Sequence, residues 1–297
     1  MKSNADAAVL TRTHTRTTDF VALAKPRLNM LVVGSALAGY AMGGGDPSQV
    51  FRMLATVFGT ALVAGGASAY NQILERKTDA LMQRTRLRPL PDGRLQIGEA
   101  LIFATALSAL GIATLAAGVN TLCALVALAT LLSYVVIYTP LKRVTSFATV
   151  IGAIPGALPP VIGWTAARED LSQGAWVLFG ILFLWQLPHF LAIAWMFRED
   201  YARAGFPMLP VLEPDGRSTG RQAMIYSAAL LPLSLAPTLI GLTGRAYFIG
   251  ALALAALFLT LTVKFAMSRS RADARRLFFG SIIYLPLLWI LMIANRV

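Results

Sequence analysis

The sequence predicts an all-α integral membrane protein with about nine transmembrane helices. Of its 297 residues, 57% are hydrophobic and 13% are charged, and the mean hydropathy is +0.65. Soluble domains carry about 25% charged residues. The apolar residues fall into nine segments long enough to cross a bilayer, and the basic residues gather in alternate connections between those segments. These three observations together indicate the fold class.

Each predicted span is a stretch of about 17–25 mostly apolar residues, the length that an α-helix needs to cross the hydrocarbon core. Turn residues and charges separate one span from the next. The predicted spans are 28–44, 50–71, 97–116, 119–139, 145–166, 173–196, 222–242, 246–266 and 277–295. The fifth contains Pro155, Pro159 and Pro160, which predict a kink or an interruption in that helix.

The distribution of basic residues predicts the orientation of the chain. With the N-terminus inside, 22 of the 26 Lys and Arg residues lie on the inner side. Cytoplasmic loops of membrane proteins carry such an excess of positive charge, so we expect a cytoplasmic N-terminus. The two longest and most charged inner loops are 75–96 and 198–221. We therefore expect the chemistry on the cytoplasmic side of a bacterial inner membrane.

The polar segment 1–24 lacks the apolar core of a cleaved signal, so it is expected to be a disordered cytoplasmic tail. Residues 25–297 are expected to form a single transmembrane domain. A basic composition also occurs in nucleic-acid-binding proteins, but here the basic residues set the topology in a lipid bilayer, and no nucleic-acid partner is expected. The single cysteine, Cys123, lies in an apolar segment, which excludes a disulfide framework and a cysteine-based metal site.

Asn71, Glu75 and Asp79 follow the second predicted span at four-residue intervals, which places them on one face of a continuing helix. Carboxylate and amide oxygens are the ligands that Mg²⁺ prefers. The arginines that follow, including Arg84 and Arg88, carry planar donor groups suited to phosphate oxygens. Together they predict a clamp for Mg²⁺ and a diphosphate.

The same carboxylates could instead form an ordinary interfacial charge cluster with Arg76 and Lys77. Their position favours a functional role, because the polar series begins inside an apolar segment, where a polar side chain is costly. The alternatives differ in whether the carboxylates meet a ligand or only neighbouring cations.

The segment NQILERKTDALMQRTRLRP, residues 71–89, resembles the first signature of the UbiA family of intramembrane prenyltransferases, in the form found in its haem-modifying branch. In most of the family, aspartates stand where this chain has Gln72 and Glu75. The resemblance implies a helical bundle around a central cavity, with a cytoplasmic cap over the diphosphate site.

Lys142 and Arg143 end the fourth predicted span, four and five residues after Tyr138. Paired cations at a helix end are often topology anchors. The family resemblance instead implies that Lys142 and Arg143 bind the diphosphate, and we adopt that interpretation.

The sixth predicted span contains Gln186 and His189 within an apolar stretch that includes the motif PHF. A buried histidine is often a hydrogen-bonded core residue, but a polar side chain at membrane depth favours function. We expect His189 to face haem as an iron ligand or a proton carrier, with Gln186 beside it.

The second family signature, normally a pair of aspartates, is missing here. In its place stands REDYARAGFPMLPV, residues 198–211, which resembles the haem-modifying branch. We expect Arg198 to bind diphosphate, Glu199 and Asp200 to contribute to metal binding, and Tyr201 to line the haem site. The alternative for the two acids is a solvated helix end balanced by Arg198 and Arg203.

The resemblance implies transfer of a farnesyl group from farnesyl diphosphate to a vinyl group of haem B, with addition of water, giving haem O. Mg²⁺ is the implied cofactor, and haem A synthase or the assembly of a haem–copper oxidase is the implied destination of the product. Two alternatives are a family member that prenylates an aromatic quinone precursor and, in a different class, a transporter of an anionic lipid or phosphate compound.

Overall fold

The computed structural model describes residues 15–46 and 48–297, and in this part of the chain the secondary structure is helical apart from one isolated β-bridge between Thr243 and Arg296. The helices are α1 (Arg16–Ala24), α2 (Pro26–Met42), α3 (Val50–Asp79), α4 (Ile97–Gly118), α5 (Thr121–Leu132), a π-helix (Ser133–Tyr138), α6 (Thr139–Leu141), α7 (Ala148–Ala157), α8 (Pro159–Arg168), α9 (Gln173–Met196), α10 (Arg198–Arg203), α11 (Leu209–Leu212), α12 (Arg217–Leu239), α13 (Arg245–Ser268) and α14 (Arg271–Ala294).

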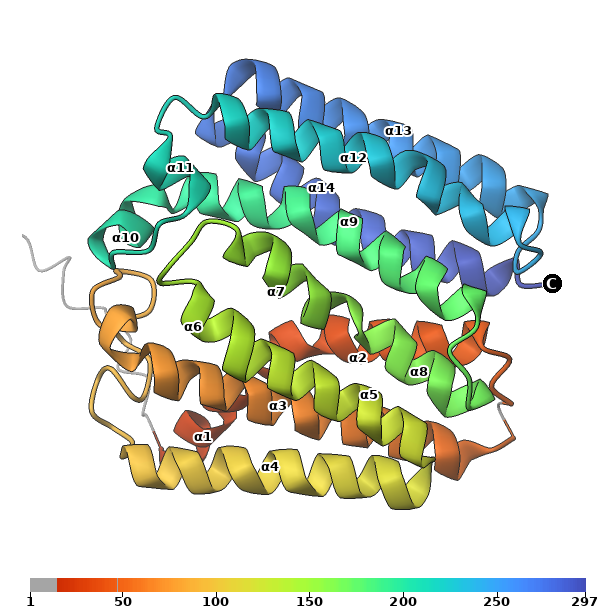
Figure 1. The fold of residues 1–297 in the computed structure, drawn as a ribbon, viewed down its shortest axis with the longest axis horizontal. Helices are drawn as coiled ribbons and strands as arrows, with labels where there is room; N and C mark the ends of the chain where they lie inside the picture. The colour runs from red at the N-terminus through yellow and green to blue at the C-terminus, as the bar shows by residue number, and fades with distance from the viewer. Residues whose placement is uncertain (1–14, 47) are drawn as a thin grey trace, which may run out of the picture.

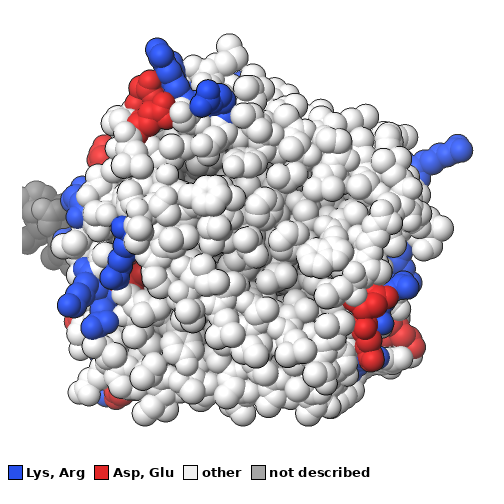
Figure 2. Space-filling view, viewed as in Figure 1, with Lys and Arg blue, Asp and Glu red and all other residues white. Residues whose placement is uncertain are grey.

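The predicted fold class is confirmed, as are nearly all of the predicted spans. Within the described residues, eight helical segments are long and apolar enough to cross a membrane, and a ninth arises if α1 and α2 count as one span bent by 40° at Lys25. The fifth span is interrupted as its prolines predict, because α7 ends at Ala157 and α8 begins at Pro159. Figure 2 shows charged side chains at the two ends of the molecule and an uncharged belt between them.

The long helices lie side by side in one bundle (Figure 1). Helix α3 packs along α4 and α2 along α8, while α9 contacts α7, α12 and α14. The segment 80–96, after α3, and the segment 197–216, with α10 and α11, lie together at one end of the bundle. We call this end the cap end. There Met82 packs against Phe206 and Met208, so the two segments that carry most of the predicted site residues are joined.

The expectation of a disordered tail over residues 1–24 is wrong for residues 16–24, which form α1. Thr15 caps this helix by accepting a hydrogen bond from the Thr18 amide, and Leu23 is fully buried in a cluster with residues of α3 and α4. The Leu23 carbonyl accepts a hydrogen bond of 2.8 Å from Gln72 Nε2. Tertiary contacts therefore stabilise α1 as a helix, although the polar composition of residues 1–24 is typical of a disordered tail. Residues 1–14 lie outside the described part of the chain.

Helices α2 and α8 cross at very short distance because each presents a glycine to the other. A Cβ atom at Gly163 would lie 1.7 Å from the Ala36 carbonyl oxygen, and one at Gly39 would lie 1.9 Å from the Pro160 carbonyl oxygen. Backbone atoms cannot move aside as a flexible side chain can, so only glycine fits both positions.

We expect Gly163→Ala to destabilise the folded protein by about 1–3 kcal/mol or more, because the added methyl group forces the two helices apart. Thermal unfolding in detergent, followed by the exposure of Cys123, measures the effect. Gly34→Ala is the matched control, since Gly34 also lies on α2 and a Cβ there meets no atom within 4 Å. An unchanged unfolding midpoint for Gly163→Ala would show that this close crossing does not limit stability.

Candidate active site

A cavity of about 800 Å³ opens among α2, α3, the π-helix, α9 and α14 toward the cap end. We call it the central cavity. Asn71, Glu75 and Asp79 line its wall, and each is less than 5% exposed. Helix α3 continues to Asp79 without a break, so the four-residue spacing places all three side chains on one face. We call these three residues the acid ladder.

The chain's own cations neutralise the two carboxylates of the acid ladder. Arg88 donates to Asp79 Oδ2 at 2.7 Å, and Lys142 Nζ donates to Glu75 Oε1 at 2.5 Å. Asp79 Oδ1 is buried and has no hydrogen-bond partner among the described residues. One oxygen of the ladder therefore remains available to a ligand.

Lys25 also lines this cavity, although we did not predict it as a site residue from the sequence. Its ammonium group lies 3.5 Å from Asn71 Oδ1 and faces the central cavity. Lys25 occupies the left-handed bend between α1 and α2, and this bend turns the side chain toward α3. A lysine followed by proline just before the first apolar span is the only signal in the sequence, and many topology anchors share it.

The π-helix positions two tyrosines and Lys142 at the cavity. The rings of Tyr134 and Tyr138 are tilted by 44° with centroids 5.3 Å apart, and Lys142 Nζ lies 5.1 Å from the Tyr138 ring. A Cβ at Gly152 would come within 2.3 Å of the Tyr138 ring, so glycine is required for this ring to occupy its place. Short π-helical segments often occur at functional sites, where they re-aim side chains.

Lys142 remains charged despite its partly buried position. Burial acts to lower the pKa of Lys142, but the oxygens of Tyr138 and Glu75 outweigh it and raise the pKa above the ordinary lysine value. A fixed positive charge therefore faces the cavity at neutral pH, as the binding of a diphosphate requires.

His189 lines the central cavity from α9, between the rings of Trp185 and Phe278 at centroid distances of 5.2 and 5.1 Å. Its Nδ1 is 2.7 Å from Ser281 Oγ, and that hydroxyl donates its proton to the Phe278 carbonyl at 2.6 Å. A hydroxyl has one proton, so Ser281 accepts from His189, and Nδ1 carries the imidazole proton. Nε2 therefore holds the free lone pair, which can bind a metal or accept a proton.

Gln186 and Tyr201, both predicted to lie near haem, also line the central cavity. Gln186 is 3% exposed and donates to the Ala153 carbonyl at 2.8 Å, so it ties α9 to α7 as well as lining the wall. Tyr201 packs edge-on against Phe206 at the cap end.

Four predicted site residues lie elsewhere. Arg143 is exposed and donates to the Leu74 carbonyl. Arg198, Glu199 and Asp200 line a second, smaller pocket and not the central cavity. Arg143 and Arg198 therefore do not line the central cavity beside the acid ladder, contrary to expectation, and their binding of diphosphate stays a prediction.

Glu199 and Asp200 do not reach the acid ladder either. Helix α9 ends at Met196, and the short α10 turns Asp200 toward Arg203 and the Gln83 amide. Within the described residues, no group of three or more His, Cys, Asp or Glu side chains is arranged to hold a metal. The expectation that these two acids join the ladder as metal ligands is corrected, and Asp200 resembles the balanced helix end that was the alternative.

The central cavity is charged at one end and apolar along its length. Lys25, Arg84, Arg88, Lys142, Arg271 and Arg275 supply basic side chains at the cap end. Leu28, Leu31, Phe190, Ile193, Phe279 and Ile282 line the remainder. Such a site suits an anion that carries a long apolar group, because the cations neutralise one part of the molecule while apolar walls cover the other.

The model of the UbiA prenyltransferase family matches residues 32–285. The chain belongs to the UbiA prenyltransferase family. It is therefore a prenyltransferase and an integral membrane protein. Among curated relatives, a protoheme IX farnesyltransferase from Solibacter usitatus is 49% identical, over 94% of this chain and 98% of that protein. A protoheme IX farnesyltransferase from Koribacter versatilis is 42% identical over 94% of this chain and 93% of its own length.

Solved UbiA structures share the fold of this UbiA chain. A digeranylgeranylglyceryl phosphate synthase matches 94% of this chain and 98% of its own with a TM-score of 0.77 at 17% identity. A UbiA homolog from Archaeoglobus fulgidus, solved bound to DMAPP and Mg²⁺, matches 92% of this chain and 99% of its own with a TM-score of 0.64 at 17% identity. These similarities confirm the all-α membrane fold.

The acid ladder has the donors that a magnesium ion requires. Asn71, Glu75 and Asp79 supply amide and carboxylate oxygens, and the unpartnered Asp79 Oδ1 is a buried acceptor in need of a positive charge. Hard oxygen ligands with positions left for water and phosphate are typical of Mg²⁺ sites. The residues of this UbiA chain therefore fit Mg²⁺.

Proposed function

We propose that this enzyme transfers a farnesyl group from farnesyl diphosphate to a vinyl group of haem B, with addition of water, giving haem O and diphosphate. The observation that carries the proposal is that one cavity joins the acid ladder and its cations to an apolar wall with a free imidazole nitrogen on His189. The relatives named protoheme IX farnesyltransferase support the choice of both substrates.

The cations paired with the acid ladder recognise the diphosphate by exchanging a carboxylate for a phosphate. Asp79 pairs with Arg88 and Glu75 with Lys142, so each carboxylate already lies beside a cation. In a complex with a metal diphosphate, Arg88, Lys142 and Lys25 would hold phosphate oxygens, and the carboxylates of Glu75 and Asp79 would hold the metal. Bound Mg²⁺ supplies Lewis-acid stabilisation of the leaving diphosphate.

The chemical step breaks the allylic C–O bond of farnesyl diphosphate and forms a C–C bond to the haem vinyl group. The electron pair of the broken bond leaves with the diphosphate, where Arg88 and Lys142 stabilise the added charge. Water then adds to the cationic carbon next to the porphyrin ring and loses a proton. The apolar walls of the cavity protect the farnesyl carbon from water before the vinyl group reacts.

His189 faces the porphyrin in this proposal. Its Nε2 lone pair is held in place by the Ser281 bond and by the two rings around the imidazole. That nitrogen can bind the haem iron or accept the proton that water loses, and the spectrum of bound haem distinguishes the two roles.

Purified protein mixed with haem B, farnesyl diphosphate and Mg²⁺ tests the proposal. The expected product is a haem whose mass has increased by one farnesyl group and one hydroxyl group, as measured by chromatography with mass detection. Formation of prenylated 4-hydroxybenzoate without haem O would identify an aromatic prenyltransferase. Transport of a phosphate compound across vesicles without any product would identify a transporter.

The site is proposed to open toward the cytoplasm of a bacterial inner membrane, where farnesyl diphosphate and Mg²⁺ can reach the cap end. The positive charge of the inner segments supports this orientation. The product would pass to haem A synthase or to the assembly of a haem–copper oxidase, two partners inferred from the family resemblance alone.

Ser281→Ala is expected to lower kcat by about 10-fold, because Nδ1 loses its acceptor and the imidazole can rotate or change tautomer. The KM for farnesyl diphosphate should stay near the wild-type value, since the acid ladder is not touched. Haem O formation at saturating and limiting farnesyl diphosphate measures both constants.

Ser227→Ala is the matched control for Ser281→Ala. Ser227 is also a buried serine in the bundle, bonded to Thr262 between α12 and α13, and it lines neither cavity. If both variants lose activity equally, the effect is one of packing, and Ser281 has no specific role in positioning His189.

A further inference from the structure

A second pocket of about 510 Å³ lies at the cap end, between the segment after α3, the end of α9, α10 and the start of α14. Five arginines line it: Arg84, Arg198, Arg203, Arg269 and Arg271. We call it the arginine pocket. Its acidic lining residues are Glu199 and Asp200. The pocket therefore carries an excess of three positive charges.

Most of these arginines make no ion pair with the chain. Asp200 pairs with Arg203. Arg198 instead lies over the Trp195 ring at 4.4 Å, and Arg84 lies over the Phe197 ring at 5.0 Å. Among the described residues, neither of these two nor Arg271 has a carboxylate partner. Like charges gathered in one pocket repel each other, and a bound anion relieves that repulsion.

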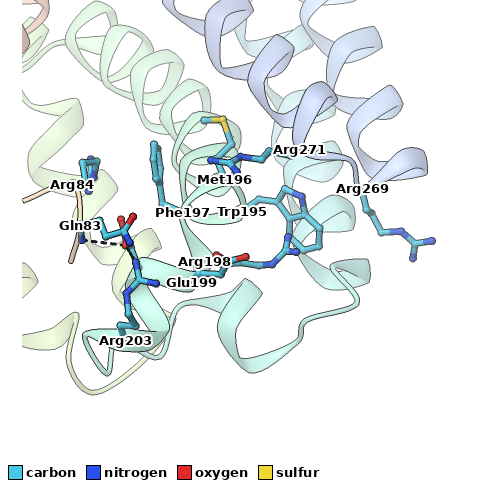
Figure 3. Close-up of a pocket in the computed structure, with 11 residues that line it drawn as sticks. Gln83, Arg84, Trp195, Met196, Phe197, Arg198, Glu199, Arg203, Arg269 and Arg271 are labelled. Atoms are coloured by element: carbon cyan, nitrogen blue, oxygen red, sulfur yellow. Dashed lines mark hydrogen bonds and ion pairs between the residues drawn. The ribbon is translucent and has the colours of Figure 1, made fainter. Parts of the chain in front are cut away.

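The arginine pocket adjoins the central cavity. Arg84, Met196, Phe197 and Arg271 line both. In Figure 3, Arg84 and Arg271 lie on either side of Phe197, and Arg271 reaches from the start of α14 toward Met196, whereas Arg269 points away from the pocket. A single ligand can therefore lie with an apolar body in the central cavity and anionic groups in the arginine pocket.

We propose that the arginine pocket binds the two propionate carboxylates of haem B, chiefly through Arg198 and Arg271. This inference rests on the proposed function and adds the position of the porphyrin. The two propionates of haem B lie on one edge of the macrocycle, and the vinyl groups lie on the other side. With its carboxylates in the arginine pocket, the porphyrin extends into the central cavity that contains the acid ladder.

The position of His189 agrees with this placement. His189 lies seven residues before Met196 on α9, which corresponds to about 10 Å of helix rise, so it faces the body of a porphyrin whose carboxylates lie near the end of α9. The residues proposed to hold the metal diphosphate, Asn71, Glu75, Asp79 and Lys142, line the central cavity and not the arginine pocket. The arginine pocket therefore offers separate cations for a second anionic group. Planar guanidinium groups also match carboxylates in geometry.

Haem B and its dimethyl ester, in which both carboxylates are blocked, provide the test. Binding of each to detergent-solubilised full-length protein is followed through the Soret absorption band. We expect the wild-type protein to bind haem B about 10–100-fold more tightly than the diester, because charge-assisted hydrogen bonds are lost on esterification. The double variant Arg198→Gln/Arg271→Gln should bind haem B as weakly as the wild type binds the diester. Its affinity for the diester should not change.

Arg217→Gln is the matched control, since Arg217 is exposed, pairs with Asp215 at the same end of the bundle and lines neither pocket. It should bind both porphyrins like the wild type. The KM for farnesyl diphosphate should be the same in all three proteins, and a rise confined to the double variant would assign these arginines to the diphosphate instead.

Equal binding of haem B and the diester by the wild type would overturn the proposal. This comparison uses the wild-type protein alone, so it does not depend on whether a variant folds. An equal loss of affinity for both porphyrins in the double variant would also overturn it. Failure of the proposed function is distinct: the wild type would then form no haem O. If haem O forms but the two porphyrins bind alike, the activity stands and the arginine pocket does not hold the propionates.

Discussion

Asp79→Asn is expected to lower kcat for haem O formation by at least about 100-fold, the scale of losing one charged group at a transition state. Asparagine keeps the size of the side chain but removes the charge from a carboxylate that has an unpartnered buried oxygen. Arg88 also loses its anionic partner. Binding of haem B should be unaffected, because the ladder contacts the diphosphate and not the porphyrin in the proposed arrangement.

The measurement is a steady-state assay across a Mg²⁺ titration, together with a haem titration on the same protein. Half-maximal activity should require more Mg²⁺ in the variant. Asp92→Asn is the matched control, because Asp92 lies in the segment 80–96 that follows Asp79 but pairs with Arg94 and lines neither pocket. Full turnover by Asp79→Asn would mean that the acid ladder is only an interfacial charge cluster.

Replacement of His189 should have the second large effect. We expect His189→Ala to lower kcat by about 100-fold or more, the usual scale for loss of a general acid or base. His189→Phe should do the same while filling the space between Trp185 and Phe278. Two variants of different size separate the loss of the imidazole from the loss of packing.

The absorption spectrum of bound haem then assigns the role. If Nε2 binds the iron, the Soret band moves in both variants; if Nε2 accepts a proton, the band stays and the pH profile of kcat changes. The KM for farnesyl diphosphate should remain close to the wild-type value. Normal turnover in His189→Phe would show that His189 is a core residue satisfied by Ser281.

The membrane fold could be predicted because its signals are local. A span is visible as a run of apolar residues, and the interruption between α7 and α8 follows from Pro159 and Pro160. The acid ladder is visible for the same reason: residues four apart share a helix face, and α3 continues through Asp79. Its burial follows from its position at the end of an apolar segment.

Local reasoning failed where the outcome depended on how an element turns. Residues 16–24 resemble a tail in composition, yet Leu23 finds a buried position between α3 and α4. Glu199 and Asp200 follow α9 directly, but the turn at Phe197 directs them into the arginine pocket and away from the ladder. Arg143 follows Lys142 directly, but both lie in the turn after α6, and there Arg143 donates to the Leu74 carbonyl and does not line the central cavity.

The sequence by itself determined the membrane class, the near-complete set of spans and the face of α3 that carries Asn71, Glu75 and Asp79. Only the tertiary structure decided which cations meet that face and which nitrogen of His189 is free. Lys142 and Glu75 are 67 residues apart, and His189 and Ser281 are 92 residues apart. Periodicity within one helix determines which side chains share a face. The partners on other helices are determined by packing between segments distant in sequence, which no local pattern records.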